Sequence, residues 1–318
     1  MSPLSCLLLS ALSPAAIPKK TVLCLGNFDG VHTAHRALIR RARAFRDASF
    51  PEASVAVLCF AEPPSVILSP SAPPSLLCTQ EDKLARLREC GAEYVILADF
   101  ASLRDTSWQE FADRILFKEC HAVALACGFN YRFGRNALGT PELLHERLPL
   151  PLLLEEEIRM DGETVSSTRI RRLLSLGRIE EANALLGTPF TFFAEVLHGK
   201  ALGRSLGLPT ANQNFPKGLC IPRHGVYASS VTASTGKVYA ALSNVGVHPT
   251  VDRNAALNCE TYILGFDGDL YGKTVRVSFL HWIRPEMTFA SKEALMEQMQ
   301  TDLALAKTFF AEHPLTQK

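Results

Sequence analysis

Two histidines, His32 and His35, stand three positions apart in the run GNFDGVHTAH, directly after an Asn-Phe-Asp-Gly turn. If a helix begins here, both imidazoles lie on its first turn and point at the same atoms. The free N–H groups and positive end of such a helix favour a phosphate. Two imidazoles beside it would stabilise the charge that develops when a nucleophile attacks the α-phosphorus of a nucleotide and pyrophosphate leaves. Two surface histidines are the alternative interpretation, and a metal pair would need further ligands.

A second segment with the residue types for phosphate chemistry is HGKALGRSLGLPTAN, residues 198–212. Its glycines let backbone N–H groups approach phosphates closely. Thr210 and Asn212 offer the hard oxygen ligands that Mg²⁺ prefers beside substrate phosphates. The Walker pattern GxxxxGK[ST] is missing, so the loop belongs to a different class of nucleotide site. A glycine-rich hairpin without a ligand stays open as the alternative.

The elements around the two histidines predict a parallel sheet. An apolar run at 21–26 leads into the turn, a basic amphipathic helix pattern covers 35–48, and a second apolar run covers 53–60. Further apolar runs at 94–100 and 122–129 each follow a helical stretch. Strands that alternate with helices favour a doubly wound α/β domain of Rossmann-like type.

The pattern changes near Ser167. Two short helices end at Gly177 and Gly187, residues that favour a left-handed helix C-cap, and Pro189 prevents continuation. Short alternating segments separated by Gly, Pro, Asn and Asp follow, which predicts an antiparallel β-barrel. A final amphipathic helix over 291–312, with Ser291 as its N-cap, is expected to cover the barrel. We therefore expect two domains, residues 1–186 and 187–318.

Composition limits the partners. With 33 Lys+Arg against 32 Asp+Glu the net charge is +1, which argues against nonspecific nucleic-acid binding by the whole protein. Nine cysteines without a CxxC pair fit reduced thiols in the cytoplasm. The apolar start lacks the basic region of a secretion signal and is too short to span a bilayer, so we expect no membrane partner. We expect the segment before Thr21 to pack beside the first strand; the oligomeric state stays open.

The first half resembles the nucleotidyltransferases with an HxGH signature, specifically the adenylyltransferase half of the bacterial bifunctional riboflavin kinase/FMN adenylyltransferases. Three segments carry the resemblance: GNFDG, CGFNYRFGRNALGT at 127–140 and VSSTRIR at 165–171. The resemblance implies catalytic roles for His32 and His35. It implies nucleotide or phosphate binding by Gly26, Asn27, Phe28, Asp29, Ser167, Thr168 and Arg169, and a flavin or nucleotide loop with Asn130 and Arg132.

The second half, about residues 188–312, resembles the riboflavin kinase domain, on its PTAN turn and a strand glutamate, Glu260. The resemblance implies that Glu260 is the general base for the riboflavin 5′-hydroxyl and that Thr210 and Asn212 hold Mg²⁺. It implies that Arg284 contacts flavin or nucleotide in a flap. The ATP-binding set that it implies is Gly199, Gly203, Arg204, Pro209, Thr210 and Asn212.

Together these resemblances imply a bifunctional enzyme that converts riboflavin and ATP to FMN, and FMN and ATP to FAD, with ATP and Mg²⁺ as its requirements. Two departures from the family pattern keep a second hypothesis open. Ala34 stands where the signature has Gly, and Pro63 stands where the family has a histidine. The alternatives are a riboflavin kinase with a degenerate first domain, or a non-catalytic flavin- or RNA-binding regulator.

Overall fold

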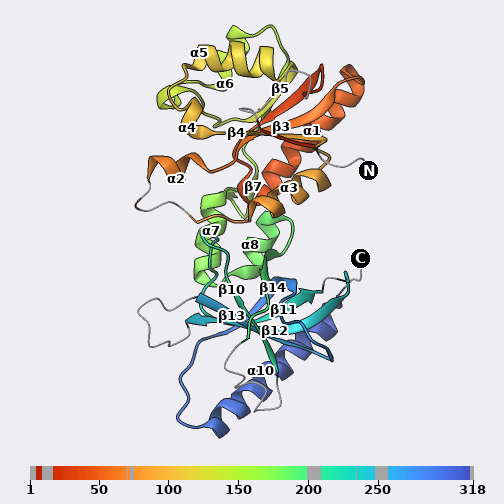
Figure 1. Ribbon diagram of the computed structural model, residues 1–318, viewed down its shortest axis with the longest axis vertical. Coiled ribbons are helices and arrows are strands. Elements are labelled where there is room, and N and C mark those ends of the chain that lie inside the picture. The colour runs from red at the N-terminus through yellow and green to blue at the C-terminus, as the bar shows by residue number, and fades with distance from the viewer. Residues whose placement is uncertain are drawn as a thin grey trace. The chain divides into compact units, whose positions relative to one another are not determined.

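The computed structural model describes residues 5–8, 17–69, 71, 75–198, 209–233, 235–247 and 257–315. The chain divides into two compact units, the first made of residues 1–74 and 80–167 and the second of residues 75–79 and 168–318 (Figure 1). Among the described helices, none is long and apolar enough to cross a membrane. All nine cysteines are free.

The first unit is built on a six-stranded parallel sheet in the order β1-β4-β3-β2-β5-β6. This confirms the doubly wound α/β prediction. The strands are β1 (Ser5–Leu8), β2 (Thr21–Leu25), β3 (Ser54–Phe60), β4 (Tyr94–Ala98), β5 (Ala122–Gly128) and β6 (Leu152–Glu155). One expectation was wrong: β1 pairs with β4 at the edge of the sheet and not with β2.

Helices pack on both faces of this sheet because its strands alternate their side chains between two cores. Along β2, Leu23 and Leu25 enter one hydrophobic cluster, whereas Val22 and Cys24 enter the other. The helical elements are η2 (Asp29–Val31), α1 (Thr33–Ser49), α2 (Pro64–Leu68), α3 (Gln80–Glu89), α4 (Phe100–Leu103), α5 (Trp108–Glu110), η3 (Phe111–Glu119), η4 (Arg135–Ala137) and α6 (Pro141–Arg147). A small hairpin, β7 (Arg159–Met160) and β8 (Glu163–Thr164), completes the unit.

The second unit is a curled antiparallel sheet in the order β10-β13-β12-β11-β14-β9. An isolated bridge between Leu197 and Asn212 joins the two ends of this order, so the barrel prediction is confirmed. The strands are β9 (Phe190–Glu195), β10 (Thr210–Asn214), β11 (Gly225–Thr232), β12 (Val238–Val247), β13 (Leu257–Ile263) and β14 (Thr274–Pro285).

Three helices accompany the barrel: α7 (Ser167–Leu176), α8 (Ile179–Leu186) and α10 (Lys292–Glu312). Helix α10 packs against β11, β12 and β14, as expected for a covering helix (Figure 1). The Ser291 side chain caps it by accepting a hydrogen bond from the N–H of Ala294 at 3.2 Å. Gly187 ends α8 with φ of 72°, the left-handed conformation that the sequence predicted there.

Candidate active sites

The switch point of the first sheet positions the first site. Successive strands are added on one side of β2 until β4, and β5 then pairs on its other side. In a doubly wound sheet, ligands bind beyond the carboxyl ends of the strands at such a reversal. A cavity of about 660 Å³ lies there, and its lining includes Gly26 after β2 and Gly128 at the end of β5. The fold therefore places the histidine turn and the 127–140 loop around one cavity.

His32 and His35 form a stacked pair in the wall of this cavity. Their ring centroids are 3.6 Å apart with an interplanar angle of 16°. The ring of Phe28, which is fully buried, packs against His35 at 5.0 Å. The Nδ1 atoms of both histidines and Oγ1 of Thr33 are buried and have no hydrogen-bond partner among the described residues. Buried polar atoms are almost always paired, so three such atoms at the start of α1 fit a polar ligand.

Burial keeps both imidazoles neutral. Desolvation lowers the pKa of His32 from 6.5 to about 4. Desolvation also holds the pKa of His35 well below its usual value, and the neighbouring His32 and Lys83 lower it further. A neutral imidazole carries one N–H donor, so the pair can donate to phosphate oxygens without adding a fixed positive charge.

The structure brings most of the predicted first-site residues together. Phe28 is the exception: it lies in the core behind His35 and is absent from the lining. Thr168 and Arg169 belong to the second compact unit, so their roles toward this site stay a prediction. The cavity lining contains Gly26, Asn27, Asp29, His32, His35, Asn130, Arg132 and Ser167.

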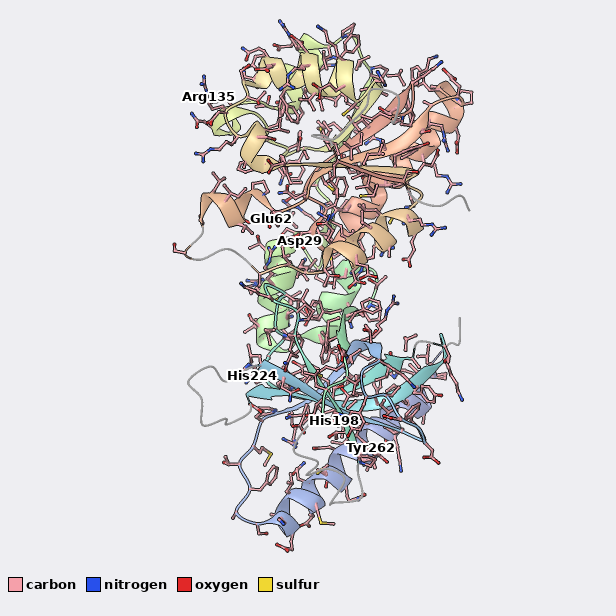
Figure 2. The ribbon with its side chains drawn as sticks, in the orientation of Figure 1. Asp29, Glu62, Arg135, His198, His224 and Tyr262 are labelled. Carbon is pink, nitrogen blue, oxygen red and sulfur yellow. The ribbon has the colours of Figure 1, made fainter. Side chains whose placement is uncertain are left out.

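The two departures from the family pattern lie at different places. Ala34 lines the cavity, so its methyl group faces the proposed nucleotide. Pro63 is the N-cap of α2 and does not line the cavity, whereas its neighbour Pro64 does. Figure 2 labels Asp29 of the histidine turn, together with Glu62 beside Pro63 and Arg135 of the 127–140 loop.

Strand register assembles the second site. Asn212 of β10 lies directly opposite Glu260 of β13, and Glu260 lies opposite Asn244 of β12. Directly opposed residues of antiparallel strands project on the same face. Thr210, opposite Tyr262, is two residues before Asn212 and shares that face. The PTAN segment, predicted as a turn, instead begins strand β10 at Thr210, and pairing with β13 makes it a neighbour of the strand glutamate.

The opposite face of these strands is the sealed barrel interior. Ser229, Ser243 and Thr261 are fully buried there, with hydroxyl oxygens linked at 2.7 and 2.8 Å. The face of Glu260 and Asn244 is only partly buried. Glu260 therefore lies on the more exposed of the two faces of this sheet.

Asn258 was missed by sequence reasoning. Its Nδ2 donates to Oδ1 of Asn212 at 3.2 Å, and its own Oδ1 is buried with no hydrogen-bond partner among the described residues. Amide oxygens are hard ligands of the kind Mg²⁺ prefers. Asn212, Asn258 and Thr210 therefore form an oxygen-rich donor set that fits the predicted ion. Asn258 gave little signal because a single Asn in a strand belongs to no motif that the sequence shows.

Three predicted ATP-binding residues, Gly199, Gly203 and Arg204, lie outside the described residues. Pro209 is described and exposed at the start of β10. His198, the last described residue before this gap, stacks on Tyr271 with ring centroids 3.9 Å apart. Figure 2 labels His198, and also Tyr262 on the face of Glu260.

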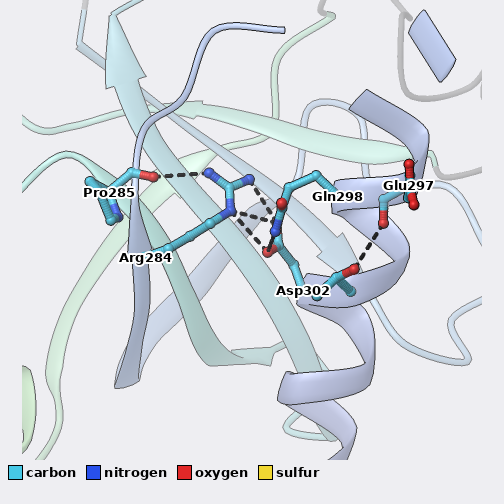
Figure 3. Close-up of polar contacts among 6 residues, drawn as sticks. Arg284, Pro285, Glu297, Gln298 and Asp302 are labelled. Atoms are coloured by element: carbon cyan, nitrogen blue, oxygen red, sulfur yellow. Dashed lines mark hydrogen bonds and ion pairs between the residues drawn. The ribbon is translucent and has the colours of Figure 1, made fainter. Parts of the chain in front are cut away.

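Arg284 lies within β14 and is bound to helix α10. Its Nε and Nη2 donate to the Asp302 carboxylate at 2.9 and 2.7 Å, and its Nη1 donates to the carbonyl of Pro285 at 2.9 Å (Figure 3). Gln298 donates to the same carboxylate at 2.9 Å. The predicted contact of Arg284 with flavin or nucleotide stays a prediction, because this arrangement commits the guanidinium to α10.

Comparisons with known proteins agree with both halves of the chain. Residues 15–169 match the family model for FAD synthetase, and residues 186–310 match that for riboflavin kinase. A bifunctional riboflavin kinase/FMN adenylyltransferase from Listeria monocytogenes is 33% identical over 294 residues, which cover 91% of this chain and 92% of the relative. The enzyme of the same description from Pseudomonas fluorescens is 34% identical over 293 residues, with coverage of 91% and 93%.

One solved structure extends the similarity of fold to nearly the whole chain. It is a crystal structure from Streptococcus pneumoniae described as a macrolide-efflux protein. It superposes with a TM-score of 0.86 at 28% sequence identity, and the match covers 95% of this chain and 98% of the other.

Proposed function

The chain belongs to the family of bifunctional riboflavin kinase/FMN adenylyltransferases, and from this premise we propose how its residues divide the two reactions. Riboflavin and ATP give FMN at the barrel, and FMN and ATP give FAD and pyrophosphate at the parallel sheet. The observation that carries the assignment is the presence of two separate groups of polar residues, each within its own domain: the stacked His32–His35 pair and the Asn212–Glu260 pair.

For adenylyl transfer, a phosphate oxygen of FMN attacks the α-phosphorus of ATP and the bond to pyrophosphate breaks. His32 and His35 donate hydrogen bonds to the α-phosphate oxygens, where negative charge increases in the transition state. Asn27 and Asp29 bind the nucleotide, and Asn130 and Arg132, which line the same cavity, bind flavin or nucleotide. Ser167, Thr168 and Arg169 hold the departing pyrophosphate, which suits a hydroxyl-rich helix start and a guanidinium.

For riboflavin phosphorylation, the 5′-hydroxyl oxygen attacks the γ-phosphorus of ATP and the bond to ADP breaks. Glu260 accepts the hydroxyl proton, because a carboxylate within reach of the nucleophile is what this step requires. Thr210 and Asn212 would hold Mg²⁺, which neutralises phosphate charge when bound. Gly199, Gly203, Arg204 and Pro209 form the ATP loop. Arg284 contacts flavin or nucleotide, which requires its guanidinium to leave Asp302.

Three further proposals accompany this function. We place the domain boundary at 186/187, next to the start of the riboflavin kinase match at residue 186, although residues 168–186 belong to the second compact unit. We place the protein in the cytoplasm, because nine free thiols suit a reducing compartment. We favour an active first domain over a degenerate one because the histidine pair and the cavity around it are intact despite Ala34 and Pro63.

One time course tests the proposal. Purified protein is incubated with riboflavin, ATP and Mg²⁺, and riboflavin, FMN and FAD are separated by chromatography. FMN followed by FAD is expected. FMN that accumulates without FAD, also from added FMN and ATP, would establish the kinase with a degenerate first domain. Binding of flavin with no product would mean a regulator.

A further inference from the structure

The turn between β2 and α1 has every backbone carbonyl from residue 27 to residue 31 engaged. One accepts from the backbone of the turn itself, and the other four accept from side chains of three different helices. These contacts join Asn27 O to Lys83 Nζ at 3.4 Å, Phe28 O to Val31 N at 3.2 Å, Asp29 O to Ser167 Oγ at 3.0 Å, Gly30 O to Arg86 Nη1 at 3.1 Å and Val31 O to Arg36 Nε at 3.0 Å.

The backbone that these contacts hold is strained. Phe28 has φ of 52° and Val31 has φ of 46°, a region that residues with a side chain seldom adopt and a β-branched residue almost never. Such conformations persist only where the surroundings impose them. The hydrogen bonds from Lys83 and Arg86 to the carbonyls of Asn27 and Gly30 therefore help to stabilise the turn in this conformation.

Two of the four side chains come from one face of α3 and are buried cations. Lys83 and Arg86, three residues apart, are 8% and 6% exposed. Charged side chains are seldom buried this deeply without partners. Lys83 Nζ also donates to the carbonyl of Phe60 at 3.3 Å, so one ammonium group ties the turn after β2 to the end of β3. Both cations are thus buried and hold the backbone of the turn through hydrogen bonds.

We propose that Lys83 and Arg86 are positioning residues for adenylyl transfer, which hold the Asn27–Gly30 backbone so that His32 and His35 meet the α-phosphate. This inference rests on the proposed function of the first site. A trans peptide keeps its C=O and N–H antiparallel, so fixing the carbonyl of Asn27 on α3 directs the next N–H away from α3. Neither cation is one of the residues that line the cavity, so neither is placed to contact a ligand there. Arg86 acts through the turn, and Lys83 acts through the turn and through its charge near His35.

The test replaces each cation by an apolar side chain of similar length and by the other cation. Lys83→Met and Arg86→Met are compared with Lys83→Arg and Arg86→Lys, and Arg88→Met, on the exposed side of the same helix, is the control. The kcat and KM for FAD formation from FMN and ATP are measured, together with riboflavin phosphorylation by the same protein. The second activity reports on the barrel domain alone, and KM values for FMN and ATP close to those of the wild type report that the first unit is still folded.

The Met variants are expected to lower the kcat of FAD formation about tenfold or more, because small misplacements of catalytic groups have effects of this size. We expect a smaller change in the KM for FMN, an unchanged rate of riboflavin phosphorylation, wild-type behaviour of Arg88→Met and substantial recovery in the conservative variants. A wild-type kcat of FAD formation in the Met variants would overturn the inference. So would an equal loss of kcat in the conservative variants Lys83→Arg and Arg86→Lys. Failure of the wild type itself to form FAD would contradict the proposed function instead.

Discussion

Asn212 and Glu260 are directly opposed across β10 and β13, so an amide and a carboxylate lie side by side on one face of the sheet, where Asn212 is buried and Glu260 is partly exposed. On the other face of the same strands, the hydroxyls of Ser243 and Thr261 are buried and bonded to each other at 2.8 Å. The alternation of a β-strand thus separates a reactive surface from a structural one.

Glu260→Gln is expected to slow riboflavin phosphorylation by about 100- to 10,000-fold, the range for loss of a general base, because the amide cannot accept the hydroxyl proton. FAD formation from added FMN should be unaffected. The measurement is the initial rate of each reaction with the purified variant. A Glu260→Gln protein that phosphorylates riboflavin at the wild-type rate would remove the proton-acceptor role.

Asn258→Ala is expected to weaken Mg²⁺ use by the kinase. Asn258 orients Oδ1 of Asn212, and loss of a partner that orients a metal ligand typically costs about 10- to 100-fold in metal affinity. The check is the Mg²⁺ concentration that gives half the maximal rate of riboflavin phosphorylation. Asn214→Ala, at the exposed end of the neighbouring strand β10, is the matched control. Equal Mg²⁺ requirements in both variants would contradict the assignment.

His32→Asn and His35→Asn are each expected to lower the kcat of FAD formation by about 100- to 1,000-fold, the usual cost of removing a donor to developing charge. Riboflavin phosphorylation should continue, because the kinase residues lie in the other domain. Single-turnover assays with FMN and ATP measure the loss. If FAD formation survives both substitutions, the histidine pair has no part in the chemistry.

The stability of the first unit should fall as the pH falls from about 6.5 to about 4. Burial lowers the pKa of His32 to about 4, so the unfolded chain binds a proton in this window that the folded chain does not. Above the window both states are neutral, and below it both are protonated, so the loss stops. His35, whose pKa is also lowered by burial, acts in the same direction.

Hydrogen exchange followed by mass spectrometry can measure this loss of stability in the first unit, through β2, and in the barrel, through β11, separately. Protection of β2 should decrease as the pH falls through the window, after correction for the intrinsic exchange rate. The double variant His32→Asn, His35→Asn should lose less of its protection over the same range. An identical pH response in this variant would show that other groups control the stability of the unit.

Asp302→Ala is expected to lower the free energy of unfolding of the barrel by about 3–5 kcal/mol, because it leaves a charge of a buried ion pair without its partner. The side chains of Arg284 and Asp302 are only 15% and 2% exposed. Urea denaturation provides the measurement, and Thr301→Ala, at an exposed position beside Asp302, provides the control. The double variant Arg284→Met, Asp302→Leu should recover much of the stability, since it leaves no unpaired charge.

Local patterns in the sequence determined the order of the elements and indicated the two phosphate-binding segments, whereas most of the individual site residues were predicted from the family resemblance. Strand, turn and helix signals around GNFDGVH predicted a parallel sheet with His32 and His35 at a helix start, and the alternation after Pro189 predicted a barrel. Residues three or four apart on a helix, or two apart on a strand, share a face whatever surrounds them. The spacing predicted that His32 and His35 point the same way, and their stacked rings agree with this, although His32 is the N-cap of α1 and not part of the helix.

Contacts between distant segments were decided only by the tertiary structure. The pairing of β1 with β4, the hydrogen bond from Asn258 to Asn212 and the burial of Lys83 and Arg86 all depend on register and packing partners. On a helix by themselves, Lys83 and Arg86 look like solvated charges. In the tertiary structure, α3 packs against a strained turn, and the two side chains donate hydrogen bonds to its carbonyls. Buried carbonyls are almost always hydrogen-bonded, and which side chains donate to them depends on the packing of distant segments.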